Sequence, residues 1–207
     1  MGIPCGQEHV WRPRDDSGEP AMTISPKYHS ENARLHENRA YGSSGHYWLG
    51  HVLELADLVN ARSLIDYGAG KGTLGKYVER YGIEYRPYDP VTFPKKPTRA
   101  ADLLVALDVL EHIEPNHLPG VLEEMLSFTG KLMFCVVSTR PAGKTLSDGR
   151  NAHLIVEDYE WWKKQLDTAT RWRGVRTRQG HDHFSYVGTP RVRPIPSNQI
   201  KTLRGEL

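Results

Sequence analysis

Residues 63–82 contain the feature that most constrains how this chain folds. A short apolar run, Ser63–Tyr67, leads directly into three glycines at alternate positions, Gly68, Gly70 and Gly72. Beyond them, apolar side chains recur at the i, i+3, i+4 and i+7 positions of a helix: Leu74, Tyr77, Val78 and Tyr81. Gly82 follows where a helix C-cap is expected. These residues predict a strand, a glycine loop and an amphipathic helix in one unit.

The rest of the chain continues this alternation. Apolar runs predict strands at 83–88, 101–107 and 131–138, and helical spacing predicts helices at 48–59, 118–125 and 159–166. Two segments of alternating polarity, 173–177 and 183–188, are joined by a glycine-containing turn and predict a closing antiparallel pair. The chain is therefore expected to form a Rossmann-like α/β fold, a mostly parallel sheet with flanking helices and a terminal antiparallel strand.

The length of the chain, 207 residues, fits one such domain with short extensions. Residues 1–27 hold four prolines and show no regular period, so they are expected to form a flexible arm. The domain itself is predicted over 28–190, and a flexible tail over 191–207.

Composition points to a soluble protein of the cytoplasm. No apolar run approaches the roughly 20 residues that span a bilayer, and residues 1–19 lack the apolar stretch of a secretory signal. Cys5 lies in a polar arm and Cys135 in an apolar run, so a disulfide between them is not expected. The net charge of +2 is too small to require a polyanionic partner. We expect no membrane partner, and the sequence does not set the oligomeric state.

Acidic residues stand at the ends of the first three predicted strands. Asp89 ends the second strand 23 residues after Asp66, close to the interval at which an acid accepts hydrogen bonds from a ribose diol. The G-x-G-x-G spacing differs from the G-x-G-x-x-G of nicotinamide and flavin binding, and no P-loop Lys-Ser/Thr pair is present. A nucleoside-bearing cofactor without a bound pyrophosphate is therefore favoured.

Two motifs resemble those of class I S-adenosylmethionine-dependent methyltransferases. Ser63–Gly72 is similar to motif I of that superfamily, and Leu107–Ile113 (LDVLEHI) is similar to its post-strand-4 motif. The resemblance covers about 48–188. It implies that Asp66 and the glycine loop contact the methionine part of S-adenosylmethionine and that Asp89 contacts its ribose. The implied cofactor-binding set is Asp66, Gly68, Ala69, Gly70, Gly72, Tyr88, Asp89, Pro90, Leu107, Asp108 and Val109.

One departure from the family pattern lies between Asp89 and Asp102. The residues between them are too few for the usual helix and third strand with its adenine-contacting acid. We therefore expect a shortened strand 3 region at the edge of the sheet. The residues after the second strand either cover the adenine or only cap the sheet edge: Tyr88, Pro90, Val91 and Phe93.

The candidate catalytic residues are Glu111, His112 and His153. Asp108, Glu111 and His112 follow a strand end at i, i+3 and i+4, so one helical turn would place them on one face. His153 follows the next strand, a position that commonly lines the acceptor pocket in the superfamily. The set is similar to the acid-x-x-Glu-His plus distant His constellation of plant-type small-RNA 2′-O-methyltransferases and to the acidic metal site of ubiquinone-pathway O-methyltransferases.

Three interpretations of this set stay open. Glu111, His112 and His153 bind Mg²⁺ or Mn²⁺, or His153 acts as a general base without metal, or the side chains only brace the loop. His181, Asp182 and His183 form a second histidine pattern before the last strand, which we interpret as turn residues rather than metal ligands.

The sequence favours a methyltransferase that acts on an oxygen or nitrogen of a small molecule or saccharide, because the short chain has room for no large recognition domain. A nucleic-acid methyltransferase that modifies an RNA ribose or terminal hydroxyl is the first alternative, suggested by the arginines between residues 171 and 193. A non-catalytic partner subunit that binds the cofactor is the second.

Overall fold

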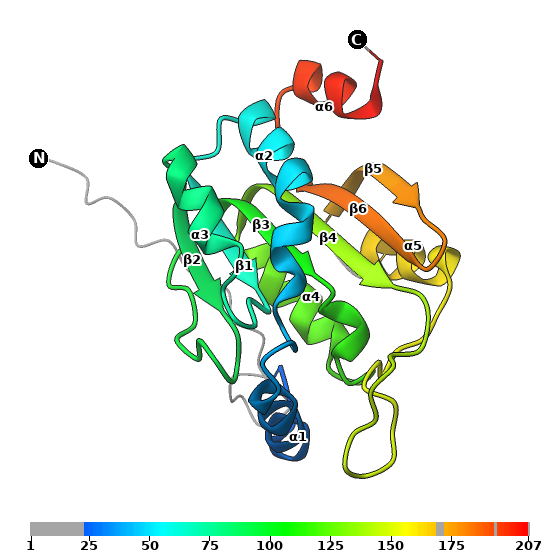
Figure 1. Cartoon of the computed structure of the whole chain (residues 1–207). Coiled ribbons are helices and arrows are strands. Elements are labelled where there is room, and N and C mark those ends of the chain that lie inside the picture. The colour runs from blue at the N-terminus through cyan, green and yellow to red at the C-terminus, as the bar shows by residue number, and fades with distance from the viewer. Residues whose placement is uncertain (1–22, 169–171, 193, 207) are drawn as a thin grey trace, which may run out of the picture.

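The computed structural model describes residues 23–168, 172–192 and 194–206. Six strands in these residues form one sheet, in the order β2-β1-β3-β4-β6-β5 (Figure 1). Four strands run parallel: β1 (Ser63–Tyr67), β2 (Glu84–Tyr88), β3 (Ala101–Leu107) and β4 (Thr129–Ser138). Two more close the sheet through antiparallel pairs: β5 (Trp172–Gln179) and β6 (His183–Pro190). This confirms the predicted fold class.

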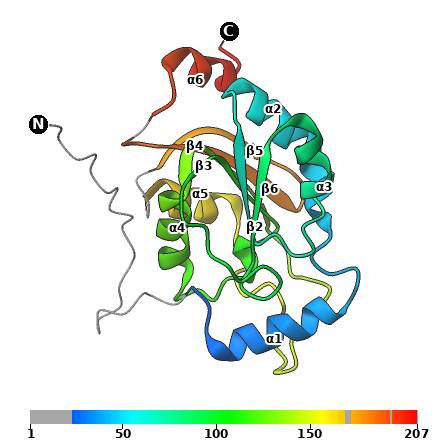
Figure 2. The same cartoon turned by 90° about the vertical axis from the view of Figure 1, so that its left-hand side faces the viewer.

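Helices cover both faces of the sheet (Figure 2). One face carries α4 (Leu118–Ser127) and α5 (Tyr159–Thr168), and the other carries α2 (Leu49–Leu58), α3 (Gly75–Val78) and α6 (Ser197–Arg204). Short 3₁₀ turns complete the set: η1 (Ser44–Trp48), η2 (Glu79–Tyr81) and η3 (Leu110–His112). No helix in the described residues is long and apolar enough to cross a membrane.

The core lies in two layers because the central strands are buried on both faces. In β3, Leu104 and Ala106 pack toward α4 and α5, whereas Leu103, Val105 and Leu107 pack toward α2 and α3. All five are at most 6% exposed. Such burial explains why β3 reads as a continuous apolar run rather than an alternating one.

The edge of the sheet beside β2 is shortened, as predicted. The residues between β2 and β3 contribute one isolated bridge, between Asp89 and Phe93, and no further strand. Strand β2 is therefore the edge strand, and its carboxyl end leads directly into the loop that begins with Asp89.

Three features differ from the sequence-based expectations. Residues 1–22 of the expected arm lie outside the described residues, but Pro26 begins a helix, α1 (Pro26–Glu37), with Ser25 as its N-cap. The segment expected as a flexible tail contains α6, whose Ile200 and Leu203 are buried against the core because they fall on one helical face.

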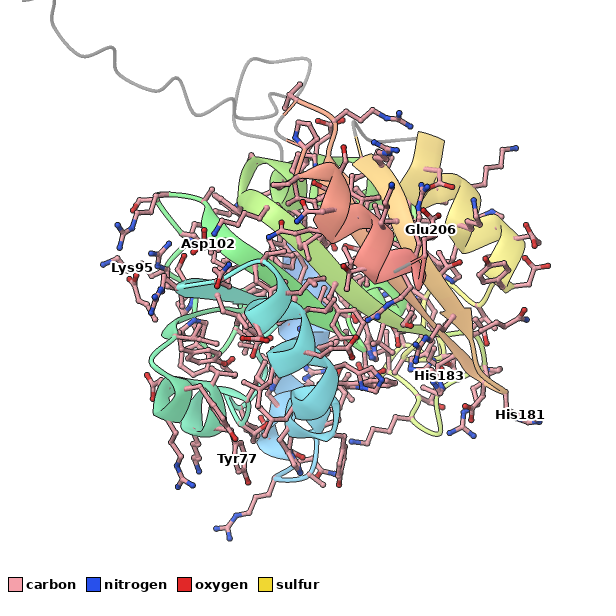
Figure 3. All side chains as sticks on the ribbon, turned by 90° about the horizontal axis from the view of Figure 1, so that it is seen from above. Tyr77, Lys95, Asp102, His181, His183 and Glu206 are labelled. Carbon is pink, nitrogen blue, oxygen red and sulfur yellow. The ribbon has the colours of Figure 1, made fainter. Side chains whose placement is uncertain are left out.

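The third difference concerns the helix after the glycine loop. It is confirmed as α3 and η2, and Gly82 caps it with a φ of +72°. However, Tyr77 points outward (Figure 3) and is 37% exposed, and Tyr81 is 64% exposed. Only Leu74 and Val78 of the predicted apolar face therefore pack into the core.

Candidate active site

A cavity of about 800 Å³ opens at the carboxyl ends of the parallel strands. Its walls come from α1, the 41–45 loop, the glycine loop, the 107–113 segment and the segment after β4. Nine predicted cofactor-binding residues line it: Asp66, Gly68, Ala69, Gly70, Asp89, Pro90, Leu107, Asp108 and Val109. Gly72 and Tyr88 are not among the lining residues. Gly72 lies beside Phe93, and the Tyr88 carbonyl accepts hydrogen bonds from Gly68 N and Ala69 N and so shapes the loop.

The glycine loop is fixed by close backbone packing. Gly68 and Gly70 have φ values of +77° and +53°, which side chains rarely allow. A Cβ at Gly70 would lie 2.4 Å from the carbonyl oxygen of Gly42, and one at Gly68 would lie 2.5 Å from Val109. Lys71 N also donates to Gly42 O at 2.7 Å. The 41–45 loop therefore rests directly on the glycine loop.

Asp89 ties the end of β2 to the glycine loop. Its Oδ1 accepts from the backbone of Val91 and Thr92 at 2.9 and 3.1 Å, and its Oδ2 accepts from Gly70 N at 3.2 Å. The Thr92 hydroxyl donates to Gly70 O at 2.5 Å. The carboxylate is thus held in place by backbone donors while it borders the cavity.

Two further aspartates lie at strand ends in low-polarity surroundings. Asp66 is buried and accepts a hydrogen bond from the Tyr85 hydroxyl at 2.6 Å, and burial raises its pKa to about 6. Asp108 has a φ of +56°, a conformation uncommon for a residue with a side chain. Ser44 Oγ donates to Asp108 Oδ2 at 3.2 Å, and burial raises the pKa of Asp108.

The three candidate catalytic residues meet at one point beyond these acids. Glu111 is fully buried; its Oε1 accepts from Ser138 N at 2.9 Å, and its Oε2 has no hydrogen-bond partner. The rings of His112 and His153 lie 4.7 Å apart at 85°. One ligand atom from each of the three residues lies within 4.8 Å of the others.

Backbone carbonyls orient both histidines. The Nδ1 atom of His112 lies 2.8 Å from Ala152 O, and that of His153 lies 2.6 Å from Arg140 O. A carbonyl only accepts, so each Nδ1 carries a proton, and in the neutral imidazole each Nε2 keeps a free lone pair. This is the arrangement by which a second hydrogen bond prepares a histidine for a metal or a proton.

Burial controls the charges of this cluster. It raises the pKa of Glu111 to about 8, with a further contribution from Asp108, and it lowers the pKa of His112 to about 4. His112 is therefore a neutral base at physiological pH. The ionised form of Glu111 is disfavoured in this environment unless a cation lies nearby.

The second histidine pattern does not form a comparable cluster in the described residues. Asp182 pairs with Arg140, with 3.0 Å between Oδ2 and Nε, and the His183 ring packs 5.3 Å from that of Trp48. His181 lies at the β5–β6 turn, where it points outward (Figure 3), and it does not line the cavity. These positions fit their interpretation as turn residues.

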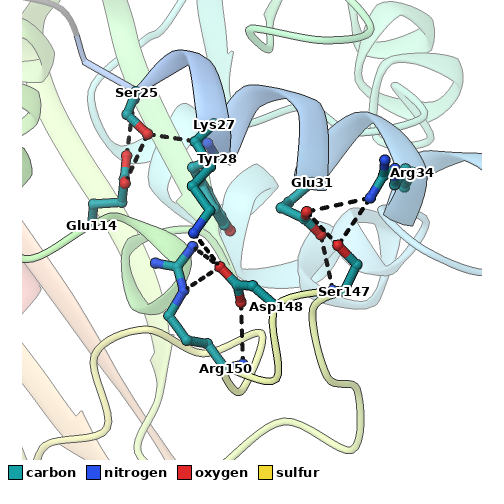
Figure 4. Close-up of polar contacts among 9 residues, drawn as sticks. All are labelled: Ser25, Lys27, Tyr28, Glu31, Arg34, Glu114, Ser147, Asp148 and Arg150. Atoms are coloured by element: carbon teal, nitrogen blue, oxygen red, sulfur yellow. Dashed lines mark hydrogen bonds and ion pairs between the residues drawn. The ribbon is translucent and has the colours of Figure 1, made fainter.

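Helix α1 is the part of the site that the sequence did not reveal. It lies across the carboxyl ends of the strands and is joined to the 146–150 segment by polar contacts (Figure 4). Glu31 accepts from Ser147 N at 2.9 Å and from Ser147 Oγ at 2.5 Å, and Lys27 pairs with Asp148 at 3.0 Å. Ser25, directly followed by Pro26, is a recognisable helix start that could have indicated α1.

The arginines of residues 171–193 contribute nothing to the cavity walls where they are described. Arg176, on β5, pairs with Glu54 of α2 at 2.8 Å. Arg171 and Arg193 lie outside the described residues.

Comparison with known proteins adds independent findings. A family model described as a methyltransferase domain matches residues 36–188. No curated protein matches the chain at a significant level.

Three solved structures illustrate the likeness in fold. A DhpI–S-adenosylhomocysteine complex has a TM-score of 0.54 at 16% identity, and covers 81% of this chain and 98% of that one. A Burkholderia thailandensis 1,6-didemethyltoxoflavin-N1-methyltransferase has a TM-score of 0.61 at 15% identity, with coverages of 82% and 92%. The methyltransferase domain of bacterial CtHen1 has a TM-score of 0.52 at 16% identity, with coverages of 70% and 98%. At these identities the likeness is one of fold.

Proposed function

This chain belongs to the methyltransferase-domain family, and from that premise we propose that it transfers the methyl group of S-adenosylmethionine to an oxygen or nitrogen of a small molecule or saccharide. One observation carries the proposal. The glycine loop, Asp89 and the Glu111–His112–His153 cluster all border a single cavity at the carboxyl ends of parallel strands. Ligands of open α/β sheets bind at such a place.

The cofactor end of the cavity fits S-adenosylmethionine. Gly68 and Gly70 present backbone without side chains, and Asp89 offers a carboxylate to a ribose diol. Bound S-adenosylmethionine supplies a methyl group on a sulfonium, which is transferred by in-line displacement. Catalysis then depends chiefly on how the chain positions the acceptor and excludes water.

The acceptor end fits a divalent cation held by Glu111, His112 and His153. The unpartnered Oε2 and the two free Nε2 atoms form a mixed oxygen and nitrogen set, which suits Mn²⁺ or a Mg²⁺ that keeps several waters. Such a cation would lower the pKa of an acceptor hydroxyl. Without a cation, the lone pair of the His153 Nε2 is free to accept the acceptor proton instead.

The size and walls of the cavity favour a small acceptor. Its volume of about 800 Å³ falls within the range of small-molecule pockets, although it must hold the cofactor as well. Helix α1 and the segment after β4 enclose the cluster of Glu111, His112 and His153. The described arginines that suggested nucleic-acid binding line no part of it.

The test is a transfer assay with methyl-labelled S-adenosylmethionine against small-molecule, saccharide, RNA and DNA pools, each with Mn²⁺ and with EDTA. We expect label in the small-molecule or saccharide pool, and loss of about 100-fold or more of turnover with EDTA or His153→Ala. His181→Ala is the matched control, since it removes an exposed histidine that does not line the cavity.

The other outcomes are equally informative. Label in RNA or DNA would favour the nucleic-acid alternative, and S-adenosylhomocysteine binding without any transfer would favour a partner subunit. Turnover that resists EDTA but falls in His153→Ala would assign His153 as a general base without metal. Turnover that ignores both changes would leave the cluster as loop bracing.

A further inference from the structure

Unpaired polar atoms are concentrated around the cavity. Six buried side-chain nitrogen or oxygen atoms in the described residues make no hydrogen bond, and three belong to cavity-lining residues: Tyr28 Oη, His36 Nδ1 and Glu111 Oε2. A buried polar atom without a partner costs about 1–3 kcal/mol, so such atoms are expected where a ligand supplies the missing bond. Two of the three come from α1. Glu111 is already accounted for, which leaves the roles of Tyr28 and His36 unassigned.

His36 lies at the cofactor end of the cavity. Its side chain is 7% exposed, and its Nε2 is 3.9 Å from Asp89 Oδ2, the oxygen that also accepts from Gly70 N. The last turn of α1 therefore places an imidazole beside the acid that would hold the ribose.

The surrounding loops hold this imidazole in place. Lys71 Nζ donates to the His36 carbonyl oxygen at 2.6 Å, which fastens the end of α1 to the glycine loop. The Tyr41 ring packs edge-on at 4.9 Å, and a Cβ at Gly42 would lie only 3.0 Å from His36 Cε1. These contacts fix the position of the His36 ring at the end of α1.

The charge state of His36 suits a hydroxyl partner. Burial lowers its pKa, Lys71 and Lys144 lower it further, and Asp89 opposes them. A neutral imidazole offers one N–H donor and one lone pair. A ribose hydroxyl likewise donates and accepts, so it matches either nitrogen.

We propose that His36 is a second ribose-binding residue, which hydrogen-bonds one hydroxyl of the cofactor's ribose while Asp89 accepts from the diol. This rests on the proposed function, because it requires S-adenosylmethionine as the ligand. It also explains why α1 stays joined to the glycine loop through Lys71: the helix completes the cofactor site from the side opposite the sheet.

The test is a double-mutant cycle in which the His36 side chain and the two ribose hydroxyls of the ligand are removed singly and together. Calorimetry measures the binding affinity of each combination. S-adenosylhomocysteine and its 2′,3′-dideoxyribose analogue are titrated into the wild type and into His36→Leu and His36→Gln. His36→Leu is expected to bind S-adenosylhomocysteine about tenfold more weakly but the dideoxy analogue within about twofold of wild type. His36→Gln keeps a donor and an acceptor, so it should recover most of the lost affinity.

Arg34→Ala is the matched control on the same helix. It removes one of the contacts of α1 with Ser147, and Arg34 does not line the cavity, so S-adenosylhomocysteine affinity should stay within about twofold of wild type. Thermal melting of each ligand-free variant reports whether the fold is retained. If His36→Leu fails to fold, the glutamine variant and the dideoxy analogue on wild type still measure the hydroxyl contact.

Two results would overturn the inference. Equal weakening of both ligands in His36→Leu would mean that His36 only packs beneath the site, and unchanged affinity for both would mean that it lies away from the ribose. A wild-type protein that binds no S-adenosylhomocysteine would instead overturn the proposed function, so the two failures are distinguishable.

Discussion

The two ends of the cavity are built in different ways. At the cofactor end, Gly68, Gly70 and Asp89 are placed by backbone turns that directly follow β1 and β2. At the acceptor end, side chains converge from segments far apart in the chain, as where Glu31 of α1 bonds Ser147. The first design depends on backbone shape and the second on side-chain chemistry. Substitutions at the two ends should therefore fail for different reasons.

The largest effect is expected at the backbone-built end, from Gly70→Val. The new Cβ would lie 2.4 Å from Gly42 O at a φ of +53°, so the 41–45 loop has to move away and the cofactor site is lost. We expect S-adenosylhomocysteine affinity to fall by about 3 kcal/mol or more. Calorimetry measures the affinity and circular dichroism the fold.

Gly82→Val is its matched control. Gly82 has a similar φ of +72°, but a Cβ there meets nothing within 4 Å. It should lose stability and retain affinity. Equal affinity losses in both variants would show that backbone strain in general, rather than contact with the 41–45 loop, controls binding.

Asp89→Ala should weaken S-adenosylhomocysteine binding by about 2 kcal/mol, because ribose hydroxyls lose a charged acceptor. Asp89→Asn separates two roles of this residue. The amide oxygen can still accept from Val91 N and Thr92 N, so the loop after β2 should keep its shape, while the charge and the acceptor for Gly70 N are lost. Calorimetry on both variants measures how much affinity is lost with the amide substitution and how much with the whole side chain. Wild-type affinity in Asp89→Ala would remove Asp89 from the ribose site.

Asp66→Asn tests whether the buried Asp66 carboxylate at the cofactor end lowers the stability of the folded protein. Burial raises the Asp66 pKa to about 6, above its unfolded value, so the unfolded state ionises first as the pH rises. Ionisation therefore destabilises the folded protein increasingly from about pH 4 to pH 6, and fully above that. Asp66→Asn should be more stable than wild type at pH 8, by up to about 3 kcal/mol, with the difference shrinking toward pH 4. Urea unfolding at both pH values measures this; a constant difference would exclude the ionisation as its cause.

Tyr28→Phe has the smallest expected effect, and it changes a single hydroxyl at the acceptor end. The Tyr28 side chain is buried against Leu146 and Ala152, and its hydroxyl has no partner. Its removal should stabilise the ligand-free protein by about 1 kcal/mol in urea unfolding. A loss of stability would mean that the hydroxyl is satisfied in the folded protein and is not held free for a ligand.

The contrast between the two ends also explains what the sequence could predict. Strands and most helices follow from local periodicity, and the glycine loop follows from a contiguous motif. Helix α1 shows no apolar period, because only Tyr28 and Leu35 among its side chains make an apolar contact with the domain and most of its attachment is polar. Its contacts with Ser147 and Asp148 join residues more than 100 positions apart, which no local pattern records.

The cluster of Glu111, His112 and His153 was predictable from the sequence only in part. The resemblance to family motifs suggested the three residues together, but not how they are oriented. Their geometry depends on two backbone carbonyls, Ala152 O and Arg140 O, whose positions only the folded loop determines. Likewise, nothing in the pattern around His36 indicated that it would lie beside Asp89, because the end of α1 is set by Lys71 and Gly42.

The shortened sheet has a consequence for self-association. Glu84 N donates to Arg62 O and Tyr88 O accepts from Gly68 N, so the even-numbered residues of β2 point their backbone groups toward β1. Pro87, at an odd-numbered position, therefore turns its nitrogen toward the open edge, where it has no hydrogen to donate. A strand from another molecule that paired with this edge would lack one backbone hydrogen bond at Pro87. The loss of the outer strand thus leaves an edge that resists the intermolecular pairing by which exposed sheets aggregate.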